Sequence, residues 1–275
     1  MGQEWKIAHE CLNMQAKLSQ SIFLNGGIEP CLEPVNAVIY RGSRRIRAMA
    51  NIPQGIHIPS GRFRNRQQAG RLLAQALMHL QTQSPIVLAL PRGGLPVAAE
   101  VASALGAPLD ILVVRKIGAP FHRELGVGAL VLLDQPEVVW NQPLLAELGL
   151  TAARMQSDVK AQEIEAQRRL SLYRGSRPAF DLKDRTVILV DDGLATGITA
   201  QAALRALRRS NPAYLVLAVP VAPPDTLARL APEAEETVCL MQPPWFSAVG
   251  QFYDDFDQTS DEEVMALMAP ARQPD

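Results

Sequence analysis

The sequence is poor in the residues that mark disulfide-linked, metal-binding and nucleic-acid-binding proteins. Its three cysteines, Cys11, Cys31 and Cys239, form no CxxC pair and no metal-ligand spacing, so neither a disulfide framework nor a zinc site is indicated. The 27 Lys and Arg residues are balanced by 28 Asp and Glu residues, which gives a net charge of -1. Nucleic-acid binders carry a basic excess instead. The composition therefore predicts a cytoplasmic protein with reduced thiols that binds no nucleic acid.

Long apolar runs and several common enzyme motifs are also missing. No apolar run has the length that spans a bilayer, and the first residues lack a charged segment followed by an apolar stretch. We therefore expect no membrane association. The patterns GxGxxG, GxxxxGK[ST], GxSxG and HExxH do not occur, so the chain carries none of the dinucleotide, P-loop, nucleophile-elbow or zinc-protease signatures.

What is present divides into two parts. Residues 1–48 have scattered polarity and a basic patch, RGSRRIR, over residues 41–47. We interpret this segment as a poorly ordered N-terminal extension with no strand, because a solvated arm explains the patch without a nucleic-acid contact. Residues 49–275 are predicted to form one domain, with regular patterning from about Arg62.

Short apolar runs alternate with helical periodicity in that domain. The predicted strands are Ile86–Leu90, Leu109–Val114, Val127–Leu133, Thr186–Val190, Tyr214–Val219 and Glu236–Met241. The predicted helices cover about 66–81, 97–105, 151–174 with Thr151 as N-cap, 200–209, and a last helix that a Ser260/Glu263 capping box opens and Met268 ends. This alternation predicts an α/β fold with a doubly wound, mostly parallel sheet.

The segment VILVDDGLATGIT, residues 187–199, carries the most specific chemistry. A buried strand runs into two carboxylates, then a Gly/Thr-rich turn, then a helix whose free N–H groups face the turn. The turn and helix N-terminus suit a phosphate monoester. Asp191 and Asp192 would repel a phosphate but accept hydrogen bonds from a vicinal diol. A sugar 5-phosphate offers both groups, whereas an ordinary DDG turn would explain only the acidic pair.

The same segment resembles the binding motif for 5-phosphoribosyl 1-pyrophosphate (PRPP) of the type I phosphoribosyltransferases. The resemblance implies that Asp191 and Asp192 hold the ribose hydroxyls. It also implies a 5-phosphate loop made of Ala195, Thr196, Gly197, Ile198 and Thr199. The stretches RFRNRQQAGRLLAQAL, LALPRGGLPVAAEVA and FSAVGQFYDDF resemble those of small bacterial members of this family, for which residues 49–275 would be the phosphoribosyltransferase domain.

Two further segments supply cations and backbone donors. In LALPRGGLP, the strand end with Arg92, Gly93 and Gly94 suits a pyrophosphate, and the resemblance implies a pyrophosphate loop here, often with a cis peptide. In VVRKIGAPFHRELGVGAL, we interpret Arg115 and Lys116 as cations that follow a strand, precede a flexible Gly/Pro stretch and stabilise the leaving group. Only the start of this stretch resembles the catalytic loop of orotate phosphoribosyltransferases, so orotate specificity is not implied. His122 is equally well explained as a catalytic-loop residue and as a loop histidine without a role.

The C-terminal WFSAVGQFYDDF is a candidate hood over the acceptor. Phe246 and Tyr253 could stack on a planar acceptor, although aromatic clusters also form plain core. The polar helix over 151–174 is a solvated face or an oligomer contact, such as that of a homodimer.

The expected function is transfer of a phosphoribosyl group from PRPP to a small-molecule nitrogen acceptor, a nucleobase being the class that the family favours. Arg115, Lys116, Asp191 and Asp192 would be the catalytic residues. Magnesium would be the cofactor, held through PRPP and water rather than by assigned protein ligands. A PRPP- or nucleotide-sensing module without catalysis is the alternative, because the fold alone does not separate the two.

Overall fold

The computed structural model of the chain describes residues 39–41, 44–46, 61–133 and 135–269. All of them belong to Asn36–Asp275, one of two compact units into which the chain divides. Most of the predicted extension, residues 1–48, lies outside the described residues. Within it, strands β1 (Ile39–Arg41) and β2 (Arg44–Ile46) pair antiparallel. The expectation that this segment holds no strand is therefore wrong there, and a domain boundary after residue 48 stays a prediction.

A five-stranded parallel sheet forms the centre of the domain, in the order β10-β9-β8-β3-β4. Its strands are β3 (Ile86–Ala89), β4 (Leu109–Ile111), β8 (Thr186–Val190), β9 (Tyr214–Val221) and β10 (Glu236–Met241). Nearly all of their residues are buried, as expected for strands that are covered on both faces. The predicted doubly wound, mostly parallel sheet is confirmed.

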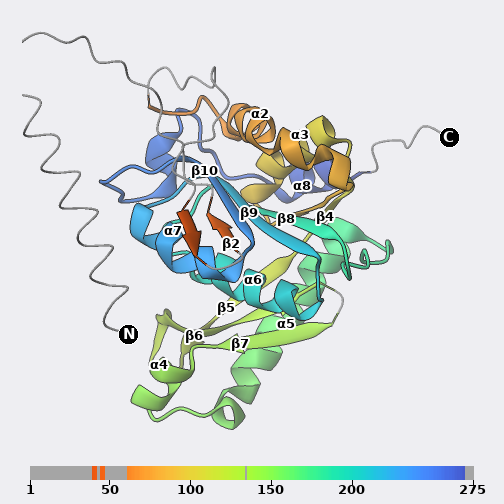
Figure 1. The fold of residues 1–275 in the computed structure, drawn as a ribbon. Helices are drawn as coiled ribbons and strands as arrows, with labels where there is room; N and C mark the ends of the chain where they lie inside the picture. Colours follow the sequence, from red (N-terminus) through yellow and green to blue (C-terminus); the bar gives the residue numbers. More distant parts are fainter. Residues whose placement is uncertain (1–38, 42–43, 47–60, 134, 270–275) are drawn as a thin grey trace, which may run out of the picture. The chain divides into compact units, whose positions relative to one another are not determined.

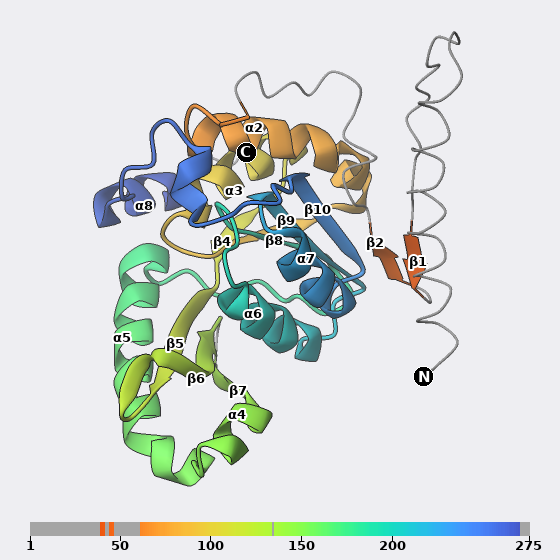
Figure 2. The ribbon, with the colours of Figure 1, turned by 90° about the vertical axis from the view of Figure 1, so that its left-hand side faces the viewer.

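Helices cover both faces of this sheet (Figures 1 and 2). On one face, α2 (Arg66–Leu77) and α3 (Gly94–Leu105) pack in a core with Val87, Ile188 and Val216. On the other face, α6 (Ile198–Arg209) and α7 (Pro224–Leu230) pack with their neighbours Leu88, Leu189 and Leu217. Because side chains alternate along a strand, each strand supplies both cores.

A second, antiparallel sheet follows β4, and here the sequence prediction was incomplete. Strands β5 (Val113–Ala119), β6 (His122–Leu132) and β7 (Pro136–Trp140) pair in the order β5-β6-β7. The apolar run 109–114 therefore splits between two sheets at Leu112, and β7 was missed. Ala119 and His122 pair across the turn, and a connection this short permits only antiparallel pairing.

The predicted helices agree with the structure apart from their ends, whereas α7 and the short helix α4 were not predicted. Helix α2 ends at Leu77 and continues as a 3-10 turn, and α3 begins at Gly94, with Pro96 in its first turn, where proline is tolerated. Thr151 caps a 3-10 turn that leads into α5, and the Ser260/Glu263 capping box opens α8 as predicted. The bounds are η1 (Met78–Gln83), α4 (Gln142–Glu147), η2 (Ala152–Met155), α5 (Gln156–Arg174), η3 (Ala231–Glu233), η4 (Val249–Phe252) and α8 (Asp261–Met268).

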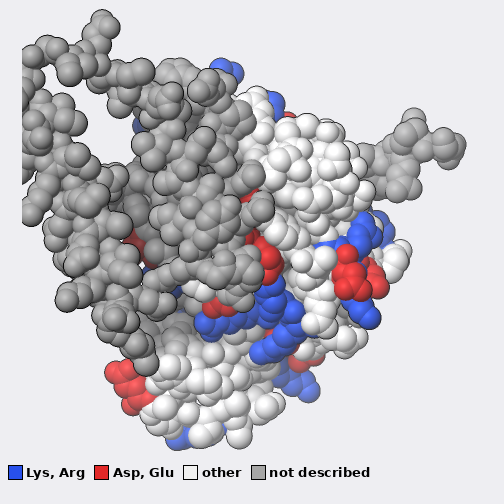
Figure 3. All heavy atoms as spheres, viewed as in Figure 1, with Lys and Arg blue, Asp and Glu red and all other residues white. Residues whose placement is uncertain are grey.

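Several charged side chains at the surface lie next to partners of opposite sign. Arg205 and Arg208 of α6 form ion pairs with Glu233 and Glu235, and Figure 3 shows basic and acidic side chains interspersed on that face. No helix among the described residues combines the length and the apolar character that a bilayer crossing requires.

A buried ion pair joins the two sheets. Arg174, at the end of α5, donates from Nε to Oδ1 of Asp110 in β4 over 2.9 Å, and both side chains are at most 5% exposed. The same guanidinium donates to the carbonyl oxygens of Ile111 and Leu133. Asp110 and Arg174 therefore fix the second sheet and α5 to the edge of the central sheet.

Replacing Arg174 with alanine is expected to lower the free energy of unfolding by about 3–5 kcal/mol, because Asp110 would remain buried without its partner. Arg168→Ala on the same helix is the matched control. Arg168 pairs with Glu165 at the exposed surface, where an ion pair contributes little to stability. Urea unfolding of the two variants measures the difference, and equal losses would contradict a special role for Arg174.

Candidate functional site

The acidic pair and the PRGG turn meet at the carboxyl ends of two neighbouring strands. Strands β3 and β8 are paired in the sheet, and the chain leaves them in opposite directions, to β4 and to β9. Helices α3 and α6, which follow them, cover opposite faces. This is the topological switch point at which doubly wound sheets bind ligands. The two segments that the sequence predicted for PRPP thus come together there.

Glycines let the two strand ends touch. A Cβ atom on Gly93 would overlap Oδ2 of Asp192, and one on Gly94 would lie 2.9 Å from Cα of Asp191. The main chain is also joined here, since the amide of Leu90 donates to the carbonyl oxygen of Val190 over 2.9 Å. Any side chain at residue 93 or 94 would therefore push the acidic pair and the PRGG turn apart.

Burial strongly shapes the protonation of the acidic pair. Burial, followed by the nearby charge of Asp192, raises the pKa of Asp191 well above its ordinary value. Burial also raises the pKa of Asp192, but there the guanidinium of Arg66 opposes it. Arg66 Nε lies 2.8 Å from Asp192 Oδ2. Two adjacent carboxylates with such different surroundings are expected to favour the ionised form at Asp192 rather than at Asp191.

The predicted 5-phosphate loop is open to solvent on one side and supported on the other. Gly197 adopts a φ of +68°, α6 begins at Ile198, and the side chain of Ile198 is exposed. Helix α7 supports the loop, because Thr226 and Arg229 donate to the carbonyl oxygens of Ala195 and Thr196 over 2.9 and 2.6 Å. The carbonyl groups of the loop are thus bonded to α7. The N–H groups at the start of α6, and the exposed residues Thr196 and Thr199, can then donate hydrogen bonds to an anion.

The PRGG turn contains a cis peptide bond between Pro91 and Arg92, in agreement with the cis peptide that the family resemblance implied for this loop. The guanidinium of Arg92 lies 3.4 Å from Oδ1 of Asp261 in α8. The same oxygen accepts a hydrogen bond from the hydroxyl of Tyr173 in α5 over 2.5 Å. This bond holds the pKa of Asp261 below its ordinary value, so the carboxylate remains a counter-ion for Arg92 in neutral solution.

The position of Arg115 and Lys116 corrects the sequence interpretation. Both lie inside β5 and do not follow a strand, and the Gly/Pro stretch after them continues β5 and turns into β6. Gly118 marks a register irregularity in the pairing of these two strands. Arg115 Nε donates to Gln162 of α5 over 3.1 Å. Together with Lys116, these residues line a pocket of about 320 Å³ between β5 and α5.

Helix α5 links the cations that the sequence predicted separately. Gln162, Arg169 and Tyr173 are seven and four residues apart and therefore share one helical face. Gln162 contacts Arg115, and Tyr173 shares Asp261 with Arg92. Burial, followed by the charge of Arg169, lowers the pKa of Arg115 below its ordinary value. The helix was predicted to present a solvated face or an oligomer contact. The structure shows that another of its faces lies beside the predicted leaving-group residues.

The aromatic residues of the C-terminal segment separate into buried and exposed ones. Tyr253 is 1% exposed, and its ring packs against Phe63 and Phe256 with centroids 5.3 and 5.0 Å apart. Its position therefore supports a structural role rather than stacking on an acceptor. Phe246 is partly exposed and packs on Phe252, with centroids 5.0 Å apart, so part of its surface is accessible.

Comparisons with known proteins agree with this geometry. Residues 135–257 match the family described as "Phosphoribosyl transferase domain". Two Mycobacterium tuberculosis proteins, from strains CDC 1551 and H37Rv and each described as a "Putative phosphoribosyl transferase", are 48% identical over 206 residues. The crystal structure of TT1426 from Thermus thermophilus is 41% identical, with a TM-score of 0.66, and the match covers 75% of this chain and 97% of that one. The chain belongs to the type I phosphoribosyltransferase family.

The extent of these matches differs. The match covers 75% of this chain but 46% of each Mycobacterium tuberculosis protein, so the chain spans about half the length of those relatives. The shared region identifies the family and the fold of this phosphoribosyltransferase chain.

Proposed function

We propose that this chain is an enzyme that transfers the phosphoribosyl group of PRPP to a nitrogen of a small-molecule acceptor, with nucleobases as the acceptor class. In this reaction the bond from the ribose C1 to the pyrophosphate oxygen breaks, and a bond from C1 to the acceptor nitrogen forms. The acceptor loses a proton, and pyrophosphate leaves. The carrying observation is the contact between the acidic pair and the PRGG turn at the switch point of the sheet.

Each part of PRPP has a matching group in the proposal. The ribose hydroxyls donate to Asp191 and Asp192, and the 5-phosphate binds to residues 195–199 at the start of α6. The pyrophosphate binds to the PRGG turn beside Arg92. Arg115 and Lys116 interact with the charge that develops on the leaving group, which is how fixed cations accelerate such a step. Phe246 remains the candidate for contact with the acceptor.

Magnesium has a place in this proposal through the substrate. Among the described residues, no group of three or more His, Cys, Asp or Glu side chains could hold a metal ion. Magnesium retains water readily and is often bound through substrate phosphates. We therefore propose that magnesium enters with the diphosphate oxygens of PRPP, where it would neutralise part of the leaving group's charge.

A sensing module without catalysis is the second candidate. The observation that favours it is the burial of Tyr253, because one of the two predicted acceptor contacts is then lost. The two candidates differ in turnover and not in PRPP binding.

Pyrophosphate release tests the proposal. PRPP and magnesium are incubated with the protein and with purine, pyrimidine or pyridine bases, and pyrophosphate is measured against time. We expect acceptor-dependent release from the parent protein and none from an Asp191→Asn/Asp192→Asn variant. PRPP binding without release for any acceptor would favour the sensing module instead.

A further inference from the structure

Two segments from opposite ends of the domain meet beside Asp192. Residues 62–66 (RFRNR) precede and open α2, and residues 252–257 (FYDDFD) lie near the C-terminus. Their main chains are joined by Phe63 N to Phe252 O at 2.8 Å, Asp254 N to Phe63 O at 2.8 Å and Asp255 N to Arg64 O at 2.9 Å. We call this pair of segments the clamp. The sequence resemblance included both segments, but the proposed reaction assigns them no role.

Arg66 connects the clamp to the carboxylate of Asp192. Its Nε donates to Asp192 Oδ2 over 2.8 Å, and its Nη1 donates to the carbonyl oxygen of Asp257 over 2.7 Å. Its guanidinium carbon lies 3.9 Å from the centre of the Phe256 ring. The Arg66 and Asp192 side chains are 10% and 14% exposed. Arg66 is therefore fixed on several sides, and it holds one carboxylate oxygen of Asp192.

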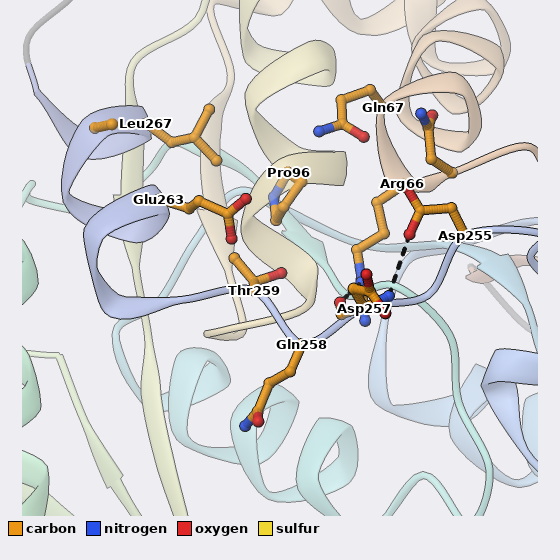
Figure 4. A pocket seen from close by; sticks show the side chains of 11 residues that line it. Arg66, Gln67, Pro96, Asp255, Asp257, Gln258, Thr259, Glu263 and Leu267 are labelled. Carbon is orange, nitrogen blue, oxygen red and sulfur yellow. Dashed lines mark hydrogen bonds between the residues drawn. The ribbon is translucent and has the colours of Figure 1, made fainter.

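Tyr253 connects the clamp to the main chain of the same residue. Its hydroxyl donates to the carbonyl oxygen of Asp192 over 2.6 Å. The two clamp segments thus hold Asp192 at its side chain and at its backbone. Figure 4 shows Arg66 reaching from α2 to the segment that carries Asp257, where both line a pocket of about 400 Å³.

We propose that Arg66 and Tyr253 are positioning residues that hold Asp192 in the geometry that accepts the ribose diol. This inference rests on the proposed function, because it assigns the clamp to the ribose site. The charged groups that face Asp192 are Arg66 from α2 and Asp191 beside it, and Tyr253 adds its hydroxyl. Gly93 of the PRGG turn adds no charge. Of these groups, only Arg66 favours the ionised form of Asp192 through its charge.

The sign of the pH effect follows from that arrangement. Arg66 opposes the rise that burial causes in the pKa of Asp192. Removing the guanidinium raises this pKa further, so Asp192 becomes ionised only at a higher pH. On acidification, PRPP affinity is then expected to begin to fall at a higher pH in Arg66→Gln than in the parent protein.

Binding of PRPP with magnesium across pH tests the proposal. We expect Arg66→Gln to weaken PRPP binding about tenfold or more at neutral pH, as for a lost charged hydrogen bond. The midpoint of its plot of affinity against pH should lie at a higher pH than in the parent protein. Arg66→Lys should keep a profile closer to that of the parent because it keeps the charge. Tyr253→Phe should weaken binding about fivefold without a shift in the profile. Arg71 lies on the same helix as Arg66 and forms a surface pair with Glu100 of α3, and Arg71→Gln should change neither the affinity nor the profile.

A second readout does not depend on PRPP. Carboxyl carbon signals of labelled aspartate are followed by NMR against pH in the ligand-free protein, and Asp192→Asn identifies the signal. Arg66→Gln should raise the titration midpoint of Asp192, and Arg71→Gln should not. An unchanged midpoint or an unchanged binding profile in a folded Arg66→Gln protein would overturn the proposal. Failure of the parent protein to bind PRPP would overturn the proposed function and the ribose role. If Arg66→Gln still raised the titration midpoint of Asp192 in that case, the coupling between Arg66 and Asp192 would stand.

Discussion

Replacing Gly93 with alanine is expected to weaken PRPP binding by about a hundredfold or more while the protein stays folded. The added Cβ atom would overlap Oδ2 of Asp192, so the carboxylate would have to leave Arg66. To bind the ribose diol, the carboxylate would have to return to the position that the added methyl group blocks, and about 2.7 kcal/mol lost in this way corresponds to about a hundredfold in affinity. Calorimetric titration with PRPP and magnesium measures the loss.

Gly106→Ala provides the matched control. Gly93 and Gly106 flank the two ends of α3, and a Cβ atom on Gly106 would meet nothing within 4 Å. Because Gly106 has a φ of +62°, alanine there should cost about 1 kcal/mol of stability without changing PRPP affinity. Normal binding by Gly93→Ala would show that the contact between the PRGG turn and Asp192 is not needed for PRPP.

Replacing Lys116 with alanine is expected to lower turnover about a hundredfold or more and to leave PRPP affinity nearly unchanged. A cation beside the departing pyrophosphate interacts most strongly once charge has developed there, and such an interaction contributes to the rate rather than to binding. Asp192→Asn should instead weaken binding itself, because the ribose diol is present before and during the reaction. Calorimetry and initial rates with an active acceptor separate the two effects.

Lys183→Ala is the control for that experiment. Lys183 is exposed in the turn that precedes β8, at the amino end of the strand and therefore away from the acidic pair. It should behave like the parent protein in both measurements. Equal losses of affinity in Lys116→Ala and Asp192→Asn would make Lys116 an ordinary binding residue.

The central sheet could be predicted from the sequence because its strands are apolar throughout. Thr186–Val190 and Glu236–Met241 are buried on both faces, and their predicted bounds agree with the structure. The second sheet was harder to predict. In strand β5 the adjacent cations Arg115 and Lys116 interrupt the buried residues, and β7 begins at a proline. Local pattern alone does not show to which sheet such a strand belongs.

The parts of the site that lie within one segment were predictable, and those that depend on tertiary contacts were not. The acidic pair and the phosphate loop are contiguous in VDDGLATGIT. Arg66 and Asp261 reach the site from positions far away in the sequence. Their only sequence signals were the RFRNR stretch and a capping box. The same limitation affected Tyr253, since a buried and a stacking aromatic residue look alike in a sequence.

Calorimetric titration of the parent protein with PRPP, with and without magnesium, tests the central claim most directly. We expect saturable, magnesium-dependent binding of one PRPP per chain, and its loss in Asp191→Asn/Asp192→Asn. At a free PRPP concentration about one hundred times the dissociation constant, the same binding should add about 2.7 kcal/mol to the free energy of unfolding. The absence of magnesium-dependent heat at millimolar PRPP, with a folded protein, would contradict the account.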